Sequence, residues 1–414
     1  NTTIRGSIAL DGQFTDNWSW NAALTYSENE RKIVQPDTVN SRLTAALAGM
    51  GGESGTETFN IFDSSANSPE LVDWLSTNAV NRRETELLVG DFVVTGDLFE
   101  MNAGPVGFAA GLQYRDEGYI DKRNDVSRLA VDPDTGEIIP ADLIFLGGGF
   151  PVDVDRQSYA AFAEMQIPLT ESIDVNLAVR YEDLDTDSSV DPKIAVRWQV
   201  TDSWIVRASA STAFREPSLA QIYATETSLQ GIQDFNPDGS PKGGAVFVRV
   251  NANGNTDLEP EESTNYNLGV IWQPTDSLDF RVDYWRFDYE DVITIENAQG
   301  KLINDLNGED IIRLAGDDSQ LTGINVDYIN AAAVDTDGLD VAASYIVDTS
   351  AGSFGINLEA THFLSYEIPD PQGGTQDVVG LFNYNNFARS IPAVSYTHLT
   401  LPTTCNLCRS RWSP

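Results

Sequence analysis

Side chains able to take part in catalysis are scarce in this sequence. His362 is the only histidine before the final stretch of the chain, and both cysteines, Cys405 and Cys408, lie close to the end. Acid–base or nucleophilic catalysis needs a base within hydrogen-bond reach of a nucleophile, and a single Cys-x-x-Cys pair lacks the second pair of ligands of a zinc site. The sequence therefore predicts a protein that is not an enzyme and that needs no cofactor.

One acidic segment has the spacing of calcium ligands. Four aspartates occupy the first, third, fifth and ninth places of an EF-hand-like loop: Asp183, Asp185, Asp187 and Asp191. The glycine that such a loop needs for its turn is replaced by Ser188, and the bidentate glutamate is replaced by Ile194. We favour an acidic strand extension and loop over a metal site, and predict no metal.

A second charged set is more informative, because its members alternate with apolar residues along extended segments. The basic members are Arg115, Arg180, Lys193, Arg197, Arg207 and Arg281, and the acidic members that share their face are Asp174, Glu182, Asp279 and Asp283. Opposite charges on one wet face can pair between neighbouring strands. Trp285 shares this polar face, and its ring is a candidate for stacking on a sugar or an aromatic chelator.

The elements that position these residues are β-strands. Apolar residues recur at every second position from Ile194 to Val200, and again from Trp204 to Ala210 after a short turn at residues 201–203. When apolar residues recur at every second position, alternate side chains lie on opposite faces of a strand. The same pattern recurs along the chain in about a dozen segments, so we expect an antiparallel all-β protein.

The connections between these segments alternate between short turns and long polar loops, which puts all the long loops at one end of an up-and-down sheet. Aromatic residues stand repeatedly at the ends of the apolar faces, among them Trp18, Tyr114, Tyr159, Trp204 and Trp272. No apolar run approaches the ~20 residues of a spanning helix. Long loops at one end and aromatic girdles are typical of outer-membrane β-barrels.

Three features of the long loops lead to specific expectations. Residues 28–86 form a long polar connection with one short helix near residues 69–78, behind the N-cap candidate Ser68. Residues 118–155 form a second long loop. Within it, Gly147, Gly148 and Gly149 lack the lysine and spacing of a phosphate-binding loop, so we interpret them as a flexible hinge.

The charge balance excludes one class of partner. The net charge is −38 and the sequence pI is about 4.1, whereas nucleic-acid binding needs clustered lysine and arginine. We therefore expect no nucleic-acid partner. The acidity itself names no ligand.

Two segments on either side of a long connection resemble motifs of the TonB-dependent outer-membrane receptors. The residues that carry the first are Ala213, Phe214, Arg215, Pro217, Ser218 and Leu219, and those that carry the second are Asn255, Leu258, Pro260 and Glu261. The resemblance implies a bacterial outer-membrane receptor that takes up a scarce solute, such as a siderophore or an oligosaccharide, with energy supplied by TonB. It also implies that the plug domain, which meets the TonB complex, lies outside this chain.

We accordingly expect residues 1–393 to be one membrane-spanning antiparallel β-barrel domain with long extracellular loops, part of a barrel of roughly 22 strands. It would lie in outer-membrane lipid as a monomer and bind a small-molecule solute. Residues 394–414 carry no acidic residue and no strand or helix period, and we expect a non-native run-on tail. Two alternatives stay open: a passive outer-membrane porin, and a soluble acidic β-rich adhesin or lectin.

Overall fold

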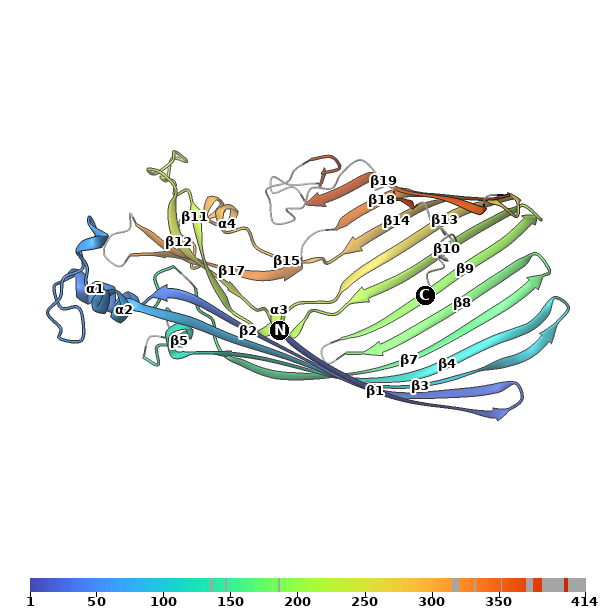
Figure 1. The fold of residues 1–414 in the computed structure, drawn as a ribbon, viewed down its shortest axis with the longest axis horizontal. Helices are drawn as coiled ribbons and strands as arrows, with labels where there is room; N and C mark the ends of the chain where they lie inside the picture. The colour runs from blue at the N-terminus through green and yellow to red at the C-terminus, as the bar shows by residue number, and fades with distance from the viewer. Residues whose placement is uncertain are drawn as a thin grey trace, which may run out of the picture.

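A computed structural model of the chain describes residues 1–134, 136, 138–145, 147–184, 187–314, 320–330, 333–350, 352–369, 375–381 and 398–400. Most of them belong to one 14-stranded antiparallel sheet, the barrel sheet (Figure 1). Its strands, in spatial order, are β1 (Thr2–Thr15), β2 (Trp18–Thr38), β3 (Ser76–Met101), β4 (Gly104–Arg123), β7 (Val152–Thr170), β8 (Ile173–Asp183), β9 (Ser188–Thr201), β10 (Trp204–Arg215), β13 (Glu261–Thr275), β14 (Leu278–Glu290), β18 (Val334–Thr349), β19 (Gly352–Pro369) and β20 (Thr375–Asp377), with β21 (His398–Thr400) beside β19.

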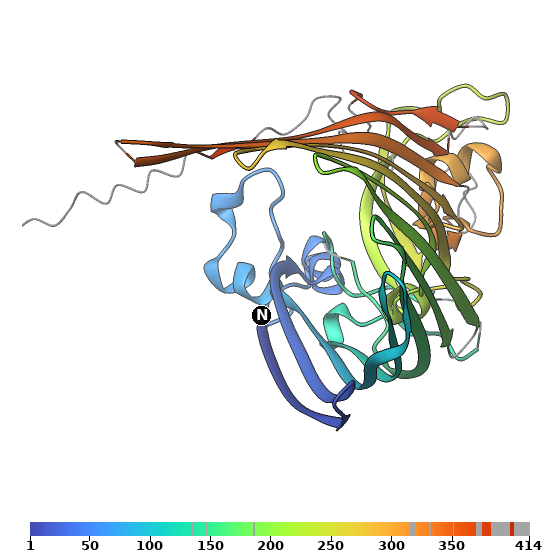
Figure 2. The same cartoon turned by 90° about the vertical axis from the view of Figure 1, so that its right-hand side faces the viewer.

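The order of long strands follows the chain, as the prediction of an up-and-down all-β architecture requires. The sheet is curved into a trough (Figure 2), and within the described residues β1 pairs only with β2. Figure 1 shows the tight turns gathered at one end and the loop elements at the other. We call this second end the loop end.

The two faces of the barrel sheet differ as the period of two predicts. On the outer face, large apolar side chains lie exposed, with Ile8 at 72%, Leu112 at 60% and Leu268 at 54% of their full accessibility. Aromatic pairs lie there near the tight turns, for example Trp204 and Trp272 with ring centroids 5.6 Å apart. Apolar side chains that face outward from a polar-lined sheet suit contact with hydrocarbon.

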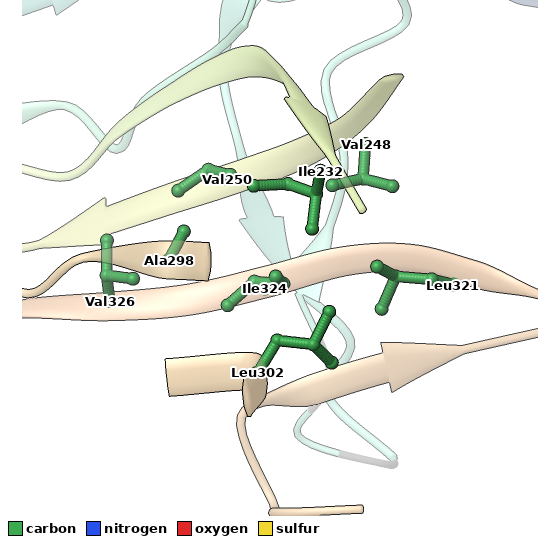
Figure 3. Close-up of a cluster of buried hydrophobic side chains, with 8 residues drawn as sticks. All are labelled: Ile232, Val248, Val250, Ala298, Leu302, Leu321, Ile324 and Val326. Carbon is green, nitrogen blue, oxygen red and sulfur yellow. The ribbon is translucent and has the colours of Figure 1, made fainter. Parts of the chain in front are cut away.

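The described hydrophobic clusters lie instead at the loop end. The largest belongs to a five-stranded loop sheet of β11 (Glu226–Ile232), β12 (Val246–Asn253), β17 (Leu321–Asn330), β15 (Ile293–Ile295) and β16 (Ile311–Arg313), covered by α4 (Ala298–Asn304). Leu302 and Ile324 are fully buried in its core (Figure 3). Because β12 comes from the β10–β13 connection and β17 from the β14–β18 connection, two loops share one core.

The remaining loop elements are short. Helix α1 (Asn40–Leu47) packs on α2 (Pro69–Leu75) through Ala46 and Leu71, and two short strands, β5 (Ala130–Val131) and β6 (Ile138–Ile139), pair within the β4–β7 connection. Helix α3 (Leu219–Tyr223) follows β10. The predicted helix behind Ser68 is confirmed as α2, where the Ser68 side chain accepts a hydrogen bond from the Leu71 N–H at 3.0 Å.

The predicted length of the first long loop was wrong. Strand β2 continues to Thr38 and β3 begins at Ser76, so the strands extend well beyond residues 28 and 86. These extensions carry polar residues on both faces, such as Glu30 paired with Arg82, and hence show no alternation. Among the described residues, no helix combines the length and hydropathy needed to cross a bilayer.

Candidate functional site

The predicted polar face is the inner, concave face of the barrel sheet, and five of its six predicted basic residues are paired with acidic residues. The acidic partners are those that the alternation placed on the same face: Arg115 and Arg180 contact Glu182 (2.8 and 2.6 Å), Arg207 contacts Asp283 (2.6 Å), Arg281 contacts Asp279 (2.6 Å), and Arg197 lies 3.7 Å from Asp174. Most of these pairs link neighbouring or next-nearest strands. This geometry fits the interpretation that the inner charges bridge strands.

A glycine makes the longest of these bridges possible. Arg207 on β10 and Asp283 on β14 lie on either side of β13, where Gly269 is the cross-strand partner of both. The guanidinium donates to both carboxylate oxygens, from Nε at 2.9 Å and from Nη2 at 2.6 Å. A Cβ at Gly269 would collide with the Asp283 carboxylate, so glycine is required for the arginine to reach across β13.

Trp285 also lies on the inner face, as predicted, but it is packed against other aromatic residues. Its ring is 5.4 Å from that of Phe363 in an edge-on arrangement and 5.6 Å from that of Phe287. Gly338 leaves room beneath it, because a Cβ there would lie 2.5 Å from the indole. The half-buried ring belongs to an aromatic strip on β14 and β19; its role as a solute contact stays a prediction.

The two motif segments meet at the base of the β10–β13 connection. Arg215, the last residue of β10, and Glu261, the first of β13, are cross-strand partners joined by two hydrogen bonds of 2.5 and 2.6 Å. The Glu261 carboxylate also accepts from the Ile293 N–H at 2.7 Å. We call this pair the loop clamp, because it closes the point where the connection leaves and re-enters the sheet.

The other motif residues shape the same connection. By strand alternation, Phe214 lies on the outer face of β10. Leu258 and Pro217 are buried, and Pro260 is half-buried beside the clamp. Ser218 caps α3 in a capping box with Gln221. The motif residues thus close the base of the β10–β13 connection and cap the helix that follows β10.

Between Arg215 and Pro217 lies a residue that the motif leaves unspecified, Glu216, and the structure makes it central. Its side chain is 7% exposed and contacts Arg156 at 3.0 Å and Arg115 at 3.5 Å. Arg156 also donates to the Pro217 carbonyl at 2.7 Å. Burial raises the pKa of the Glu216 carboxyl, although the neighbouring Arg156 and Arg115 oppose this shift.

These contacts border a hollow of about 630 Å³ on the inner face near the loop end. Its lining is rich in charge of both signs and includes Arg115, Arg156, Arg180, Arg215, Glu182 and Glu216. The arrangement can hold a polar solute by charge-assisted hydrogen bonds.

Beyond α3 the chain continues along the inner face to the far side of the sheet. Glu226, the first residue of β11, pairs with Arg83 on β3 at 2.9 Å. Arg83 also pairs with the buried carboxylate of Asp121, at 3.1 Å. Residues 216–227, which we call the crossbar, therefore run from β10 past β7 and β4 to β3.

The interpretation of Gly147, Gly148 and Gly149 as a flexible hinge was wrong. The Gly148 carbonyl accepts from the Thr227 N–H at 2.8 Å, and the Gly149 carbonyl accepts from the Leu129 N–H at 3.0 Å. A Cβ at Gly147 would collide with the Thr227 carbonyl. Glycine is required because the backbone packs directly against β11.

The calcium candidate gains no support from the geometry. Asp191 accepts hydrogen bonds from Ser189 and Thr212, and Asp187 accepts one from the Ser188 N–H. Asp185 lies outside the described residues. Within the part of the chain that the structure describes, no group of three or more histidine, cysteine, aspartate or glutamate side chains is arranged to hold a metal ion.

Comparison with known proteins decides the family. The family model described as "TonB dependent receptor-like, beta-barrel" matches residues 1–402. This chain belongs to the β-barrel family of TonB-dependent receptors. The family consists of outer-membrane receptors and transporters, and membership does not support the porin or adhesin alternatives.

Several named proteins are similar to this receptor. A probable TonB-dependent siderophore receptor, PirA of Acinetobacter baumannii, is 24% identical over 295 residues, which are 71% of this chain and 33% of that protein. An iron-regulated outer membrane virulence protein of Vibrio cholerae is 27% identical over 142 residues, 34% of this chain and 19% of that protein. The chain thus spans a third or less of these curated relatives.

Solved structures agree in fold. The crystal structure of the siderophore receptor PirA from Acinetobacter baumannii has a TM-score of 0.54 at 18% identity, covering 92% of this chain and 46% of that one. A ferric enterobactin receptor (PfeA) mutant from Pseudomonas aeruginosa in complex with enterobactin has a TM-score of 0.58 at 16% identity, covering 91% and 46%. These likenesses establish the barrel architecture.

Sequence reasoning missed the partners of the crossbar. Arg156 falls at the edge of the region interpreted as a loop, although extending the period of two by one step from Ser158 would have placed it on the inner face. Arg83 and Glu226 gave no local signal, because their pairing joins residues 143 positions apart. The proposed tail is mostly outside the described residues and stays a prediction.

Proposed function

We propose that the complete receptor imports an iron–siderophore complex across the outer membrane, with energy supplied through TonB. Family membership over residues 1–402 carries the proposal. The substrate class is inferred from the probable siderophore receptor PirA, which aligns with 71% of this chain. An oligosaccharide, the other solute that the sequence left open, has no counterpart among the relatives named above.

The geometry is consistent with such a solute. The outer face presents apolar side chains to outer-membrane lipid, and the inner face presents paired charges to water. A ferric chelate is polar and bulky, and the charged hollow at the loop end offers several guanidinium groups and carboxylates around about 630 Å³. We propose further that the receptor acts as a monomer.

Uptake of radioactive iron by whole cells tests this proposal. The complete receptor is produced in a bacterial strain that lacks its own siderophore receptors, and the cells are offered ferric enterobactin and a panel of other ferric siderophores. We expect accumulation of iron from at least one chelate, and loss of that accumulation in a matched strain without TonB. TonB-independent accumulation, or no accumulation of iron from any chelate of the panel, would refute the siderophore assignment.

A further inference from the structure

A hollow of about 580 Å³ lies on the outer face of the barrel sheet, across the strands from β4 to β13. Two neighbouring rows of the sheet register line it. One row consists of Phe108, Met165, Leu177, Ile194, Ala210 and Tyr266. The other carries shorter side chains: Ala163, Val179, Pro192, Thr212 and Thr264. The shorter side chains leave a furrow across the strands, which we call the outer groove.

The outer groove has a length and a direction that suit one acyl chain. It crosses six strands and is roughly 24 Å long, since neighbouring strands lie about 4.8 Å apart. It runs obliquely, because Phe108 lies near the tight turn where β4 begins, whereas Tyr266 lies well along β13 from the tight turn that follows this strand. An acyl chain that enters at Tyr266, on the side of the loop end, would descend along the groove into the bilayer.

Beside Tyr266 the groove reaches a split in the barrel wall. The β9–β10 ladder ends at the pair Lys193 and Ser211, although both strands continue beyond it on their other neighbours. The N–H groups of an antiparallel strand point alternately to its two neighbours. Because the Gln199 N–H donates to the Ser172 carbonyl on the β8 side, the nitrogen of Pro192 faces β10. Proline has no N–H to continue that ladder, so the two strands diverge there.

The split contains a polar hollow of about 150 Å³, which shares Thr212 and Thr264 with the outer groove. Among the described residues that line it, four are acidic and none is basic; the acidic ones are Asp191, Glu262, Asp288 and Glu290. Asp191 already accepts hydrogen bonds from Ser189 and Thr212, and Asp288 is paired with Arg286. The remaining two carboxylates, Glu262 and Glu290, are the acidic pair.

The acidic pair is arranged unfavourably for the protein alone. Glu262 and Glu290 are direct cross-strand partners, and both are exposed. Like charges directly opposite each other destabilise a sheet. In the part of the chain that the structure describes, neither forms an ion pair, whereas the adjacent Glu261 and the nearby Asp288 each contact an arginine. An ammonium group between the two carboxylates would remove the repulsion.

We propose that the outer groove and the acidic pair form a binding site for one lipid of the outer leaflet whose headgroup carries an amine. One acyl chain lies in the groove, and the headgroup ammonium lies between Glu262 and Glu290. A headgroup that carries only negative charge would be repelled by the pair. The site lies on the outer face, so it is separate from the charged hollow proposed for uptake, and its test needs no solute.

Native mass spectrometry of the complete receptor in a non-ionic detergent tests the acidic pair. The delipidated receptor is mixed with dioleoyl phosphatidylethanolamine, or with the same lipid acetylated at its amine, which keeps both chains but has no ammonium group. We expect one lipid per receptor, with the acetylated lipid bound at least tenfold more weakly. Glu262→Gln/Glu290→Gln should abolish this preference. Glu28→Gln/Glu86→Gln, a second cross-strand glutamate pair outside the groove, should keep it.

A second pair of variants tests the groove. Ala163→Phe puts a ring into the groove and should weaken binding of both lipids at least tenfold, whereas Ala208→Phe, outside the groove lining on the outer face, should leave binding unchanged. The folded band on unheated gels shows that each variant has folded, and if Ala163→Phe does not fold, the acidic-pair variants decide.

Equal binding of the two lipids by the unchanged receptor, a preference that survives in Glu262→Gln/Glu290→Gln, or full binding by folded Ala163→Phe would overturn the lipid site. A receptor dimer without bound lipid would assign the groove to a second copy and would overturn it equally. Each of these results stands whether or not siderophore uptake is found.

Discussion

Gly269 shows how a single missing side chain can organise an inner face. Its position on β13 lets the Arg207 guanidinium reach Asp283 two strands away. Since Arg207 is 46% exposed, the ion pair itself adds little to stability. The lack of space for a side chain at position 269 has the larger effect on folding stability.

Gly269→Ala should therefore destabilise the folded barrel by about 1–3 kcal/mol, the usual cost of forcing an extra carbon into a packed place. Equilibrium unfolding of the complete receptor in lipid vesicles measures this change. Gly107→Ala, on the inner face of β4 with its nearest neighbour at 3.8 Å, is the control and should be close to neutral. Equal costs for the two substitutions would mean that the cross-strand bridge places no demand on Gly269.

Asp234 gives a residue-level link between two loops. Its carboxylate accepts two hydrogen bonds of 2.9 Å from Arg313, which lies on β16 in the other connection. Those hydrogen bonds lower the pKa of Asp234. Because the pKa is lower in the folded than in the unfolded protein, the link stabilises the loop sheet above the ordinary aspartate pKa and is lost as the pH falls through the folded value.

We predict that acidification below about pH 3.9, the ordinary aspartate pKa, progressively loosens the loop sheet. Asp234→Asn should loosen it already at neutral pH and flatten the pH dependence. Hydrogen exchange of the β11 and β17 amides between pH 3 and 6 measures both effects. Asp257→Asn, at an exposed position in the same connection, serves as the control; a parallel pH profile in Asp234→Asn would contradict the link.

At the scale of elements, the β4–β7 connection is attached to β11 through its glycines. Gly147 packs so closely on β11 that a Cβ would overlap the Thr227 carbonyl oxygen, and the Gly148 carbonyl accepts a hydrogen bond from the Thr227 N–H at 2.8 Å. This connection also accepts a hydrogen bond from Arg249 of β12 at the Leu143 carbonyl, at 3.0 Å. The loops therefore support one another.

Gly147→Ala should detach the β4–β7 connection from β11, because its Cβ would collide with the Thr227 carbonyl, and should raise the rate of proteolytic cleavage in residues 124–151 about tenfold. That factor corresponds to about 1.4 kcal/mol of local stability, within the usual cost of overpacking. Limited proteolysis of intact cells that produce the receptor measures the rate. Gly244→Ala adds a methyl group in open space and should leave cleavage unchanged; no difference between the two variants would count against the packing role.

The sequence predicted the elements of the barrel sheet well and those of the loop end poorly. Residues 194–210 alternate because one face meets apolar surroundings and the other meets water. The extensions of β2 and β3 meet water on both faces and carry no such signal. The loop sheet depends on β12 pairing in parallel with β17, where Asn251 meets Asn325, and no local pattern reports a partner so far along the chain.

The residues of the candidate site show the same contrast between the barrel sheet, which the sequence predicted, and the loop end, which it did not. Arg207 and Asp283 were placed on one face correctly, because strand parity fixes the direction of both side chains. Glu216, Arg156 and Arg83 were missed, because their meeting depends on the path of the crossbar. That path is set by tertiary contacts, which a single sequence does not display.

At the scale of the whole molecule, the two faces of the barrel sheet define its surroundings. Ala208 and Ser209 are neighbours on β10, yet Ala208 shares the outer face with Leu268 and Ser209 shares the inner face with Asn267. Identical substitutions at these two positions should therefore have different costs. The comparison isolates the environment, because strand, depth and new side chain are nearly the same.

Ala208→Arg should destabilise the receptor by about 2–4 kcal/mol, the cost of an arginine facing the middle of the bilayer. Ser209→Arg should cost much less, since its side chain would enter water on the inner face. Unfolding in lipid vesicles, with the folded band followed on unheated gels, measures both. A larger cost at Ser209 than at Ala208 would reverse our assignment of the two faces.

The shared core of the loop sheet limits how the exterior of this receptor can be exchanged with that of a relative. Because β11 and β12 come from one connection and β15, β16 and β17 from another, replacing either connection alone would leave half of the core residues without their complement. A chimaera that acquires a new exterior must take both connections together. Recombination between receptor genes should accordingly transfer the span from β11 to β17 as one block.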